Sequence, residues 1–150
     1  MGAGLGGGSA DAAATLRALN KIASTQLSED HLFAIASTLG SDVPVCLAST
    51  PHRIKGTGDV IHPLNKIHVG ALLLVCPSVP LSTAAVFKQI TPPYNRPLPD
   101  VIDHNAVRLC GFGNDLEAAA TTLVPEINDL LIRLRETPTC HAAQMSGSGA

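Results

Sequence analysis

The first ten residues contain a dense run of glycines whose backbone N–H groups could bind an anion. Gly2-Ala3-Gly4-Leu5-Gly6-Gly7-Gly8-Ser9 runs into an apolar helical pattern without any spacer. Glycines let backbone N–H groups converge on a phosphate, and the start of a helix adds a favourable dipole. The segment therefore predicts an anion-binding loop, with a flexible glycine linker as the alternative.

Two other glycine motifs fit this segment less well. Gly2, Gly4 and Gly7 satisfy the spacing of a dinucleotide-binding loop, but such a loop needs an acidic residue about 20 positions later, after a second strand. That region has a helical pattern here. A P-loop is excluded because no Lys-Ser or Lys-Thr pair follows the glycines.

Side chains that could act in catalysis are few, and taken alone each has an ordinary structural interpretation. Asp42 precedes Val43-Pro44, and from spacing alone a turn or helix-capping role is favoured. Phe87 alone would be interpreted as a core residue. Ser146 to Gly149 alone would be an ordinary turn. The six histidines show neither HxxxH nor HxH spacing, so no metal site is predicted.

Taken together, however, several segments resemble the GHMP kinases, in the right order and over nearly the whole chain. They are GLGGGSADAAATLRALN (4–20), GSDVP (40–44), KGTGD (55–59), VFK (86–88), NDLE (114–117) and MSGSGA (145–150). The triple glycine and the GSDVP segment are similar to the branch that phosphorylates 4-diphosphocytidyl-2-C-methyl-D-erythritol. The ordered set is far more specific than any single motif.

The resemblance implies ATP-dependent phosphorylation of the 2-hydroxyl of that substrate, a step of the non-mevalonate isoprenoid-precursor pathway. It also implies Mg²⁺ that arrives with ATP, because magnesium is usually held by phosphates and a few side chains. The enzyme alternative is another GHMP kinase of the homoserine or mevalonate type. The alternative from another class is a non-catalytic nucleotide-binding module.

The resemblance also implies roles for individual residues. Asp42 would accept the proton of the attacking hydroxyl. Phe87 would stack on the cytosine ring, and Thr83, Ser146 and Gly147 would lie on the substrate side. The segment around the ATP phosphates would consist of Met1, Gly2, Ala3, Gly4, Leu5, Gly6, Gly7, Gly8, Ser9 and Ala10.

The sequence departs from this branch of the family in two respects. Ala10 stands where the branch usually has a second serine, which removes a hydroxyl from the ATP side. The segment that carries the family's catalytic lysine and cytidine-contacting aromatic residues is not matched, and neither are the elements after the third motif. We therefore expect a piece truncated at both ends, with residues 1–65 from the ATP-binding domain and 66–150 from the C-terminal domain.

The elements that must position these residues follow from local patterns. Apolar periodicity and capping signals predict helices over 9–20, over 29–39 between Ser28 and Gly40, from Ser82 or Thr83 to 87, from 114, and from Pro125 to about 135. Short strands are predicted over 45–49, 52–55, 59–62 and 70–76. The last of these is apolar enough to lie at the centre of a sheet. A further strand is predicted directly before the glycines near the end of the chain. The proline-rich stretch 91–100 is predicted to be a loop.

This grouping of helices and strands predicts an α+β fold rather than regular βαβ alternation. The resemblance specifies a GHMP kinase fold, with an N-terminal part like domain 2 of ribosomal protein S5 and a ferredoxin-like C-terminal part.

Composition narrows the partner class. Charged residues make up 15% of the 150 residues, the net charge is -2, and the chain has one Tyr and no Trp, so neither a basic footprint nor a stacking platform for nucleic acid is present. The longest apolar run, 71–76, is far shorter than the ~20 residues of a membrane helix. We expect a cytoplasmic protein with a small-molecule substrate, and the sequence predicts no oligomeric state.

Overall fold

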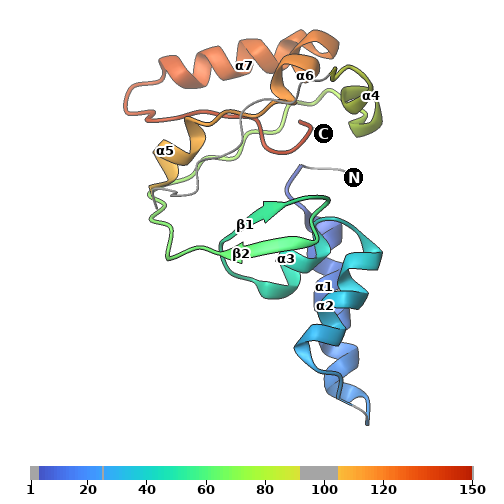
Figure 1. Ribbon diagram of the computed structural model, residues 1–150. Coiled ribbons are helices and arrows are strands. Elements are labelled where there is room, and N and C mark those ends of the chain that lie inside the picture. The colour runs from blue at the N-terminus through green and yellow to red at the C-terminus, as the bar shows by residue number, and fades with distance from the viewer. Residues whose placement is uncertain (1–3, 25, 92–104, 150) are drawn as a thin grey trace. The chain divides into compact units, whose positions relative to one another are not determined.

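The computed structural model describes residues 4–24, 26–91 and 105–149, and the chain divides into two compact units. One unit is Gly6–Ile67, and the other combines Met1–Leu5 with His68–Ala150. Figure 1 shows α1, α2, α3 and the strands β1 and β2 in the first unit, and α4 to α7 in the second. The assignment of 1–65 and 66–150 to two domains of the GHMP fold stays a prediction.

Three helices and a hairpin make up the unit Gly6–Ile67. The helices are α1 (Gly7–Ile22), α2 (Glu29–Leu39) and α3 (Val43–Ala48). The predicted bounds of α2 are confirmed: the Ser28 hydroxyl accepts the His31 N–H, as an N-cap should, and Gly40 follows the last helical residue. The first helix is also confirmed, although it begins at Gly7 rather than at Ser9.

Small side chains form the core of this unit. Ala13 of α1, Ala36 of α2 and Val43 of α3 are buried together. Alanine at two of these contacts lets the helix backbones approach closely, so that α3 packs on both α1 and α2. The start of α3, directly after Asp42, is thereby fixed to the longest helix of the unit.

The predicted strand over 45–49 is wrong, because residues 43–48 form α3. Pro44 lies in the first turn of this helix, where the missing N–H costs nothing and the fixed φ angle favours helix. A short apolar run such as Val45–Leu47 cannot be assigned to strand or helix by periodicity alone. The proline was the stronger signal.

The predicted strands over 52–55 and 59–62 are confirmed, the second shifted by one residue, and they form a hairpin. Strands β1 (His52–Lys55) and β2 (Val60–Pro63) pair antiparallel, with Lys55 opposite Val60 at the turn. The turn contains Gly56 and Gly58, both with positive φ angles, 65° and 95°. Glycine tolerates this left-handed backbone at no steric cost, which explains the position of the turn.

The second unit contains α4 (Thr83–Lys88), α5 (Ala106–Cys110), α6 (Glu117–Leu123) and α7 (Pro125–Glu136). Helix α4 is confirmed, with the Ser82 hydroxyl accepting the Ala85 N–H. Helix α7 begins at its proline as predicted, and α6 begins three residues after Asn114. Helix α5 was not predicted. Most of the predicted loop 91–100 lies outside the described residues.

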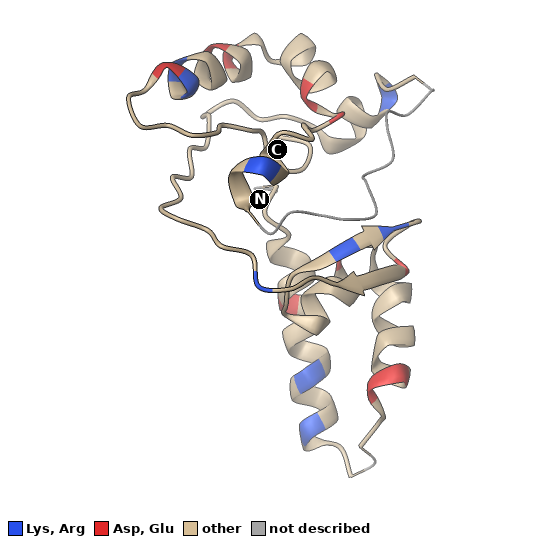
Figure 2. Ribbon diagram, turned by 60° about the vertical axis from the view of Figure 1, so that its left-hand side comes forward, with Lys and Arg blue, Asp and Glu red and all other residues tan. Residues whose placement is uncertain are grey.

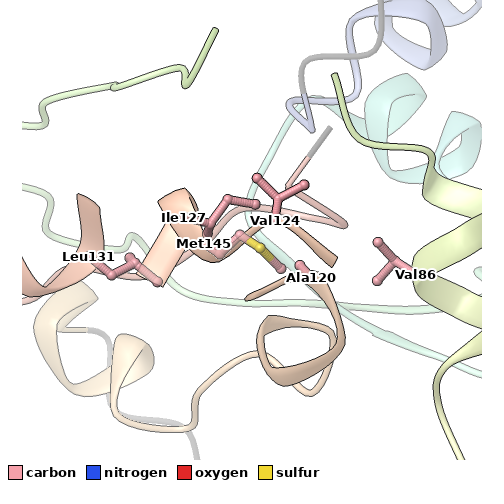
Figure 3. Close-up of a cluster of buried hydrophobic side chains, with 6 residues drawn as sticks. All are labelled: Val86, Ala120, Val124, Ile127, Leu131 and Met145. Atoms are coloured by element: carbon pink, nitrogen blue, oxygen red, sulfur yellow. The ribbon is translucent and has the colours of Figure 1, made fainter. Parts of the chain in front are cut away.

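One apolar cluster holds α4, α6 and α7 together. Figure 3 shows its six side chains, which are Val86, Ala120, Val124, Ile127, Leu131 and Met145. The last of these comes from the segment that leads into the C-terminal glycines. Burial of Met145 therefore attaches this segment to the helical core, at about 25 cal/mol for each Å² of apolar surface removed from water.

Two further predicted strands are wrong. Residues 70–76 form no strand and pair with none in the part of the chain that the structure describes, and Leu72 and Leu73 are 73% and 76% exposed. Residues 141–146 also form no strand. A continuous apolar run indicates strand propensity, but a strand requires a hydrogen-bonded neighbour, and the described residues supply none for either segment.

Charged side chains are distributed over many elements. Figure 2 shows Lys and Arg on both units. Those that lie within helices and strands are on α1, β1, α4, α5 and α7. Across the described ranges, no helix combines the length and the apolar character needed to cross a lipid bilayer.

Candidate functional site

The glycine-rich opening becomes the start of α1. Gly4 and Gly6 adopt left-handed backbone conformations, with φ angles of 61° and 67°, and Gly6 is the N-cap of the helix. A Cβ atom added at Gly6, Gly7 or Gly8 would meet nothing within 4 Å among the described residues, so these residues leave the space directly beside the three glycines open. Met1, Gly2 and Ala3 lie outside the described residues.

This helix start has the properties of an anion site. No side chain caps it, and its first turn holds no acidic residue. The first N–H groups of any helix lack partners within the helix, and the dipole makes this end positive. Ser9 and Ala10 lie in the same turn, which the Ala10 N–H closes on the Gly6 carbonyl at 2.9 Å, while Leu5 before it is exposed.

Asp42 is the N-cap residue of α3, but its side chain makes no capping hydrogen bond. The carboxylate is exposed, and the Ser41 hydroxyl donates to it at a long 3.5 Å. Its backbone carbonyl accepts the Cys46 N–H at 3.2 Å. Asp42 thus begins the helix through its backbone, which leaves its carboxylate oxygens available to act as a base.

Arg17 supports this helix from its other end, a role that the sequence did not reveal. Its guanidinium donates to the carbonyls of Leu47 (2.7 Å) and Cys46 (3.4 Å) and to the Ser49 hydroxyl. A cation at the C-terminus of a helix complements the dipole and satisfies the last carbonyls. The contacts span about 30 residues, so helical periodicity could not predict them.

The hairpin turn holds the residue before Asp42. A Cβ atom at Gly58 would overlap the backbone carbonyl of Ser41, so the turn packs directly on this segment. Glycine is required here twice, by this contact and by its φ angle of 95°. The segment that carries Asp42 is thus fixed on its N-terminal side by the packing of Gly58 on Ser41 and on its C-terminal side by α3.

A second group of predicted residues lies in the other unit, on α4. Thr83 is the first residue of this helix, and its hydroxyl lies 2.8 Å from that of Ser148. Phe87 is 57% exposed while its neighbour Val86 is fully buried. The interpretation of Phe87 as a core residue is therefore wrong, because the α4 position that faces the apolar cluster is Val86.

The C-terminal glycines form a turn beside Gly4. The Ser146 hydroxyl donates to the Gly4 carbonyl at 2.7 Å, and a Cβ atom at Gly147 would lie 3.2 Å from that same oxygen. The two glycine segments, 142 residues apart in sequence, therefore touch. Within this unit the structure brings together Thr83, Ser146, Gly147 and Gly4.

Comparison with known proteins identifies the family of the chain. Residues 1–50 match the family described as "GHMP kinases N terminal domain", a range that includes both the glycine-rich opening and Asp42. A crystal structure of a 4-(cytidine 5'-diphospho)-2C-methyl-D-erythritol kinase superposes with a TM-score of 0.73 at 33% identity, over 99% of this chain and 55% of that one. The chain belongs to the GHMP kinase family.

Two kinases named for the same substrate are similar to this chain over its whole length. The 4-diphosphocytidyl-2-C-methyl-D-erythritol kinase of Paracoccus denitrificans is 48% identical and that of Paramagnetospirillum magneticum 41%, each over 100% of this chain. The alignments cover 53% and 54% of these two proteins. The chain thus spans about half the length of the curated relatives it matches, and it has the GHMP kinase fold over that span.

Residues that hold the C-terminal turn were missed from the sequence. The sequence predicted for Asn114 the start of a helix within the NDLE segment and no further contact, but its amide donates to the carbonyls of Met145 and Gly147. Ser148 is buried, at 7% exposure, against Thr83. An Asn before a helix is a common cap, and nothing in its spacing signals a partner 31 or 33 residues away.

Proposed function

We propose that the protein phosphorylates the 2-hydroxyl of 4-diphosphocytidyl-2-C-methyl-D-erythritol with ATP. The observation that carries this proposal is the similarity of the whole chain, at 48% and 41% identity, to two kinases named for this substrate. Supporting it, the family match over residues 1–50 contains both the candidate phosphate-binding segment and the candidate base. The cytoplasmic location expected from the sequence stays a prediction.

In this proposal the opening segment, residues 1–10, binds the ATP phosphates. Among its described residues, the N–H groups at the start of α1 supply donors, and Gly6, Gly7 and Gly8 leave open space for phosphate oxygens. Phosphoryl transfer depends mainly on positioning and on stabilisation of charge, so a rigid helix start is a suitable scaffold.

Asp42 acts as the general base. It accepts the proton of the substrate 2-hydroxyl while that oxygen forms a bond to the γ-phosphorus, and the bond from the γ-phosphorus to the bridging oxygen breaks to release ADP. The exposed carboxylate, with no capping bond to break, is consistent with this role.

Mg²⁺, when bound with ATP, would neutralise charge on the phosphates. Magnesium is usually held by phosphates and a few side chains, so the ion would arrive with ATP. The described residues contain no group of three or more His, Cys, Asp or Glu side chains that could hold a metal ion. Ser9 lies in the first turn of α1, and its hydroxyl would be the side-chain oxygen of this segment that could share such an ion.

The substrate side is assigned to the second group of residues. The exposed ring of Phe87 supplies a face on which cytosine can stack. Thr83 and Ser146 supply hydroxyl groups, and Gly147 lets the turn approach without a side chain.

A substrate panel tests the proposal. The protein expressed from its complete gene is incubated with ATP, Mg²⁺ and either 4-diphosphocytidyl-2-C-methyl-D-erythritol, mevalonate or homoserine, and the products are followed by ³¹P NMR. Turnover of the first compound alone is expected. Turnover of mevalonate or homoserine would assign another GHMP kinase activity, and ATP binding without transfer to any of the three would assign a nucleotide-binding module.

A further inference from the structure

The C-terminal turn, residues 146–149, is held by the side-chain amide of Asn114, which lies three residues before α6. Both protons of the Asn114 amide nitrogen are used, one toward the Met145 carbonyl (2.9 Å) and one toward the Gly147 carbonyl (2.7 Å). Its amide oxygen accepts the Leu116 N–H at 2.9 Å, which fixes the side chain to the helix start. A planar amide with three partners has little freedom to move, so it sets the positions of these two carbonyls.

Further contacts attach the segment on either side of Asn114. Arg135 bonds the Ala143 carbonyl through Nε (3.3 Å) and Nη2 (3.2 Å) and also pairs with Glu117 at 3.1 Å. The other Glu117 oxygen accepts the Met145 N–H at 3.5 Å. These contacts hold residues 143–145, which lead into the turn. Among the described residues, only Asn114 bonds the carbonyls on both sides of Ser146.

The residue between those two carbonyls is the one that touches the N-terminal glycines. Ser146 donates to the Gly4 carbonyl at 2.7 Å, and Gly147 packs against Gly4 so closely that a methyl group would press on it. The position of the turn therefore determines where the Gly4 backbone lies. Asn114, Ser146 and Gly4 form a continuous chain of contacts within one compact unit.

We propose that Asn114 is a positioning residue for the ATP-binding segment. It acts through the turn: it fixes the carbonyls of Met145 and Gly147, the turn fixes Gly4, and Gly4 belongs to the segment that binds phosphate. The kinetic consequence of this proposal rests on the proposed kinase function, whereas the structural consequence does not.

Asn114→Asp separates the two hydrogen bonds that Asn114 donates to the turn, called the clamp below, from the one that it accepts from the Leu116 N–H. The carboxylate keeps an oxygen that can accept the Leu116 N–H, but it replaces the two donated protons with an acceptor that faces two carbonyl oxygens. Asn114→Ala removes the clamp without this repulsion and serves if the first variant does not fold. Asn20→Asp is the matched control, because Asn20 likewise donates to a carbonyl and accepts an N–H, both of Leu27, in the α1–α2 connection.

Hydrogen exchange measured by mass spectrometry tests the structural part. In Asn114→Asp, amides of 143–149 are expected to exchange at least about tenfold faster, while those around 20–27 are unchanged; Asn20→Asp should show the reverse. Unchanged exchange in 143–149, or the same increase there in both variants, would overturn the proposal whatever the activity of the protein.

Steady-state kinetics test the link to ATP. The KM for ATP is expected to rise about tenfold in Asn114→Asp and to stay within about twofold in Asn20→Asp. A turn that opens without any change in the KM for ATP would overturn the positioning role. A turn that opens in a protein whose wild type has no kinase activity would instead overturn the proposed function and leave the clamp established.

Discussion

At the scale of single residues, Phe87 is the side chain whose exposure most directly suggests a ligand. Its ring is 57% exposed on α4, beside the buried Val86. An exposed aromatic ring contributes little to packing but offers a face for a nucleobase, and stacking of one base on an aromatic side chain contributes about 1–3 kcal/mol.

Phe87→Ala is expected to raise the KM for the cytidine-containing substrate about tenfold and to lower the free energy of unfolding by less than about 1 kcal/mol. Initial-rate kinetics and urea denaturation measure the two effects. Phe112→Ala is the control, since Phe112 is similarly exposed, at 46%, on the same unit. Equal effects of the two substitutions on KM would argue against a stacking role for Phe87.

Asp59 provides a pH-dependent observable in the hairpin turn. Hydrogen bonds from its own backbone N–H, then from the Thr57 N–H (2.9 Å) and the Thr57 hydroxyl (3.1 Å), hold the pKa of this carboxyl below its ordinary value of 3.8. The folded state therefore favours the ionised form. Its stabilising contribution is complete above pH 3.8 and is lost as the pH falls through the lower, folded-state pKa.

NMR titration of the Asp59 carboxyl in the folded protein is expected to give a midpoint below 3.8. The difference in thermal stability between the wild type and Asp59→Asn should correspondingly shrink as the pH is lowered through that midpoint. A midpoint at or above 3.8 would show that the turn does not bond the carboxylate as described.

At the scale of elements, the hairpin turn and α3 together fix the backbone that carries Asp42. Gly58 is the critical contact, because its φ angle is 95° and an added Cβ atom would overlap the Ser41 carbonyl. Left-handed backbone costs a non-glycine residue about 1–2 kcal/mol before any overlap is counted.

Gly58→Ala is therefore expected to lower the free energy of unfolding by at least about 2 kcal/mol, as measured by urea denaturation. Gly70→Ala is the control, because a Cβ atom there meets nothing within 4 Å and the backbone is not left-handed. It should change stability by less than about 0.5 kcal/mol. Similar losses in both variants would mean that Gly58 does not pack on Ser41.

The sequence correctly predicted the helices that have a capping or terminating residue at their ends. Ser28 and Gly40 are the N-cap and C-cap residues of α2, Ser82 caps α4, and Pro125 is the first residue of α7. The failures were short apolar runs: residues 45–49 turned out helical and 70–76 unpaired. Periodicity cannot decide in either case. For 45–49 the deciding signal was Pro44 in the first helical turn, and for 70–76 the outcome depends on a tertiary partner that the run itself does not specify.

At the scale of the whole molecule, the order of the motifs along the chain was the most informative feature of the sequence. The resemblance placed residues 1–10, Asp42, Phe87 and the C-terminal glycines in one kinase family, and the family and its fold are confirmed. The roles of the individual residues stay predictions. Contacts such as Ser146 to Gly4 and Asn114 to Gly147 depend on the folded arrangement, and spacing in the sequence gives no sign of them.

We propose above that this chain carries the catalytic base of a kinase acting on 4-diphosphocytidyl-2-C-methyl-D-erythritol. The most direct test compares kcat and the KM for ATP in the wild type, Asp42→Asn and Asp129→Asn, each expressed from the complete gene. Asp129 is the matched control, an exposed aspartate on α7.

Asp42→Asn is expected to lower kcat about 100-fold to 10,000-fold while the KM for ATP changes less than about threefold, because a general base acts on the transfer step and not on ATP binding. Asp129→Asn should retain wild-type kcat. A kcat of Asp42→Asn within a few fold of the wild type would contradict the assignment of the base, and no transfer to this substrate by the folded wild type would contradict the account as a whole.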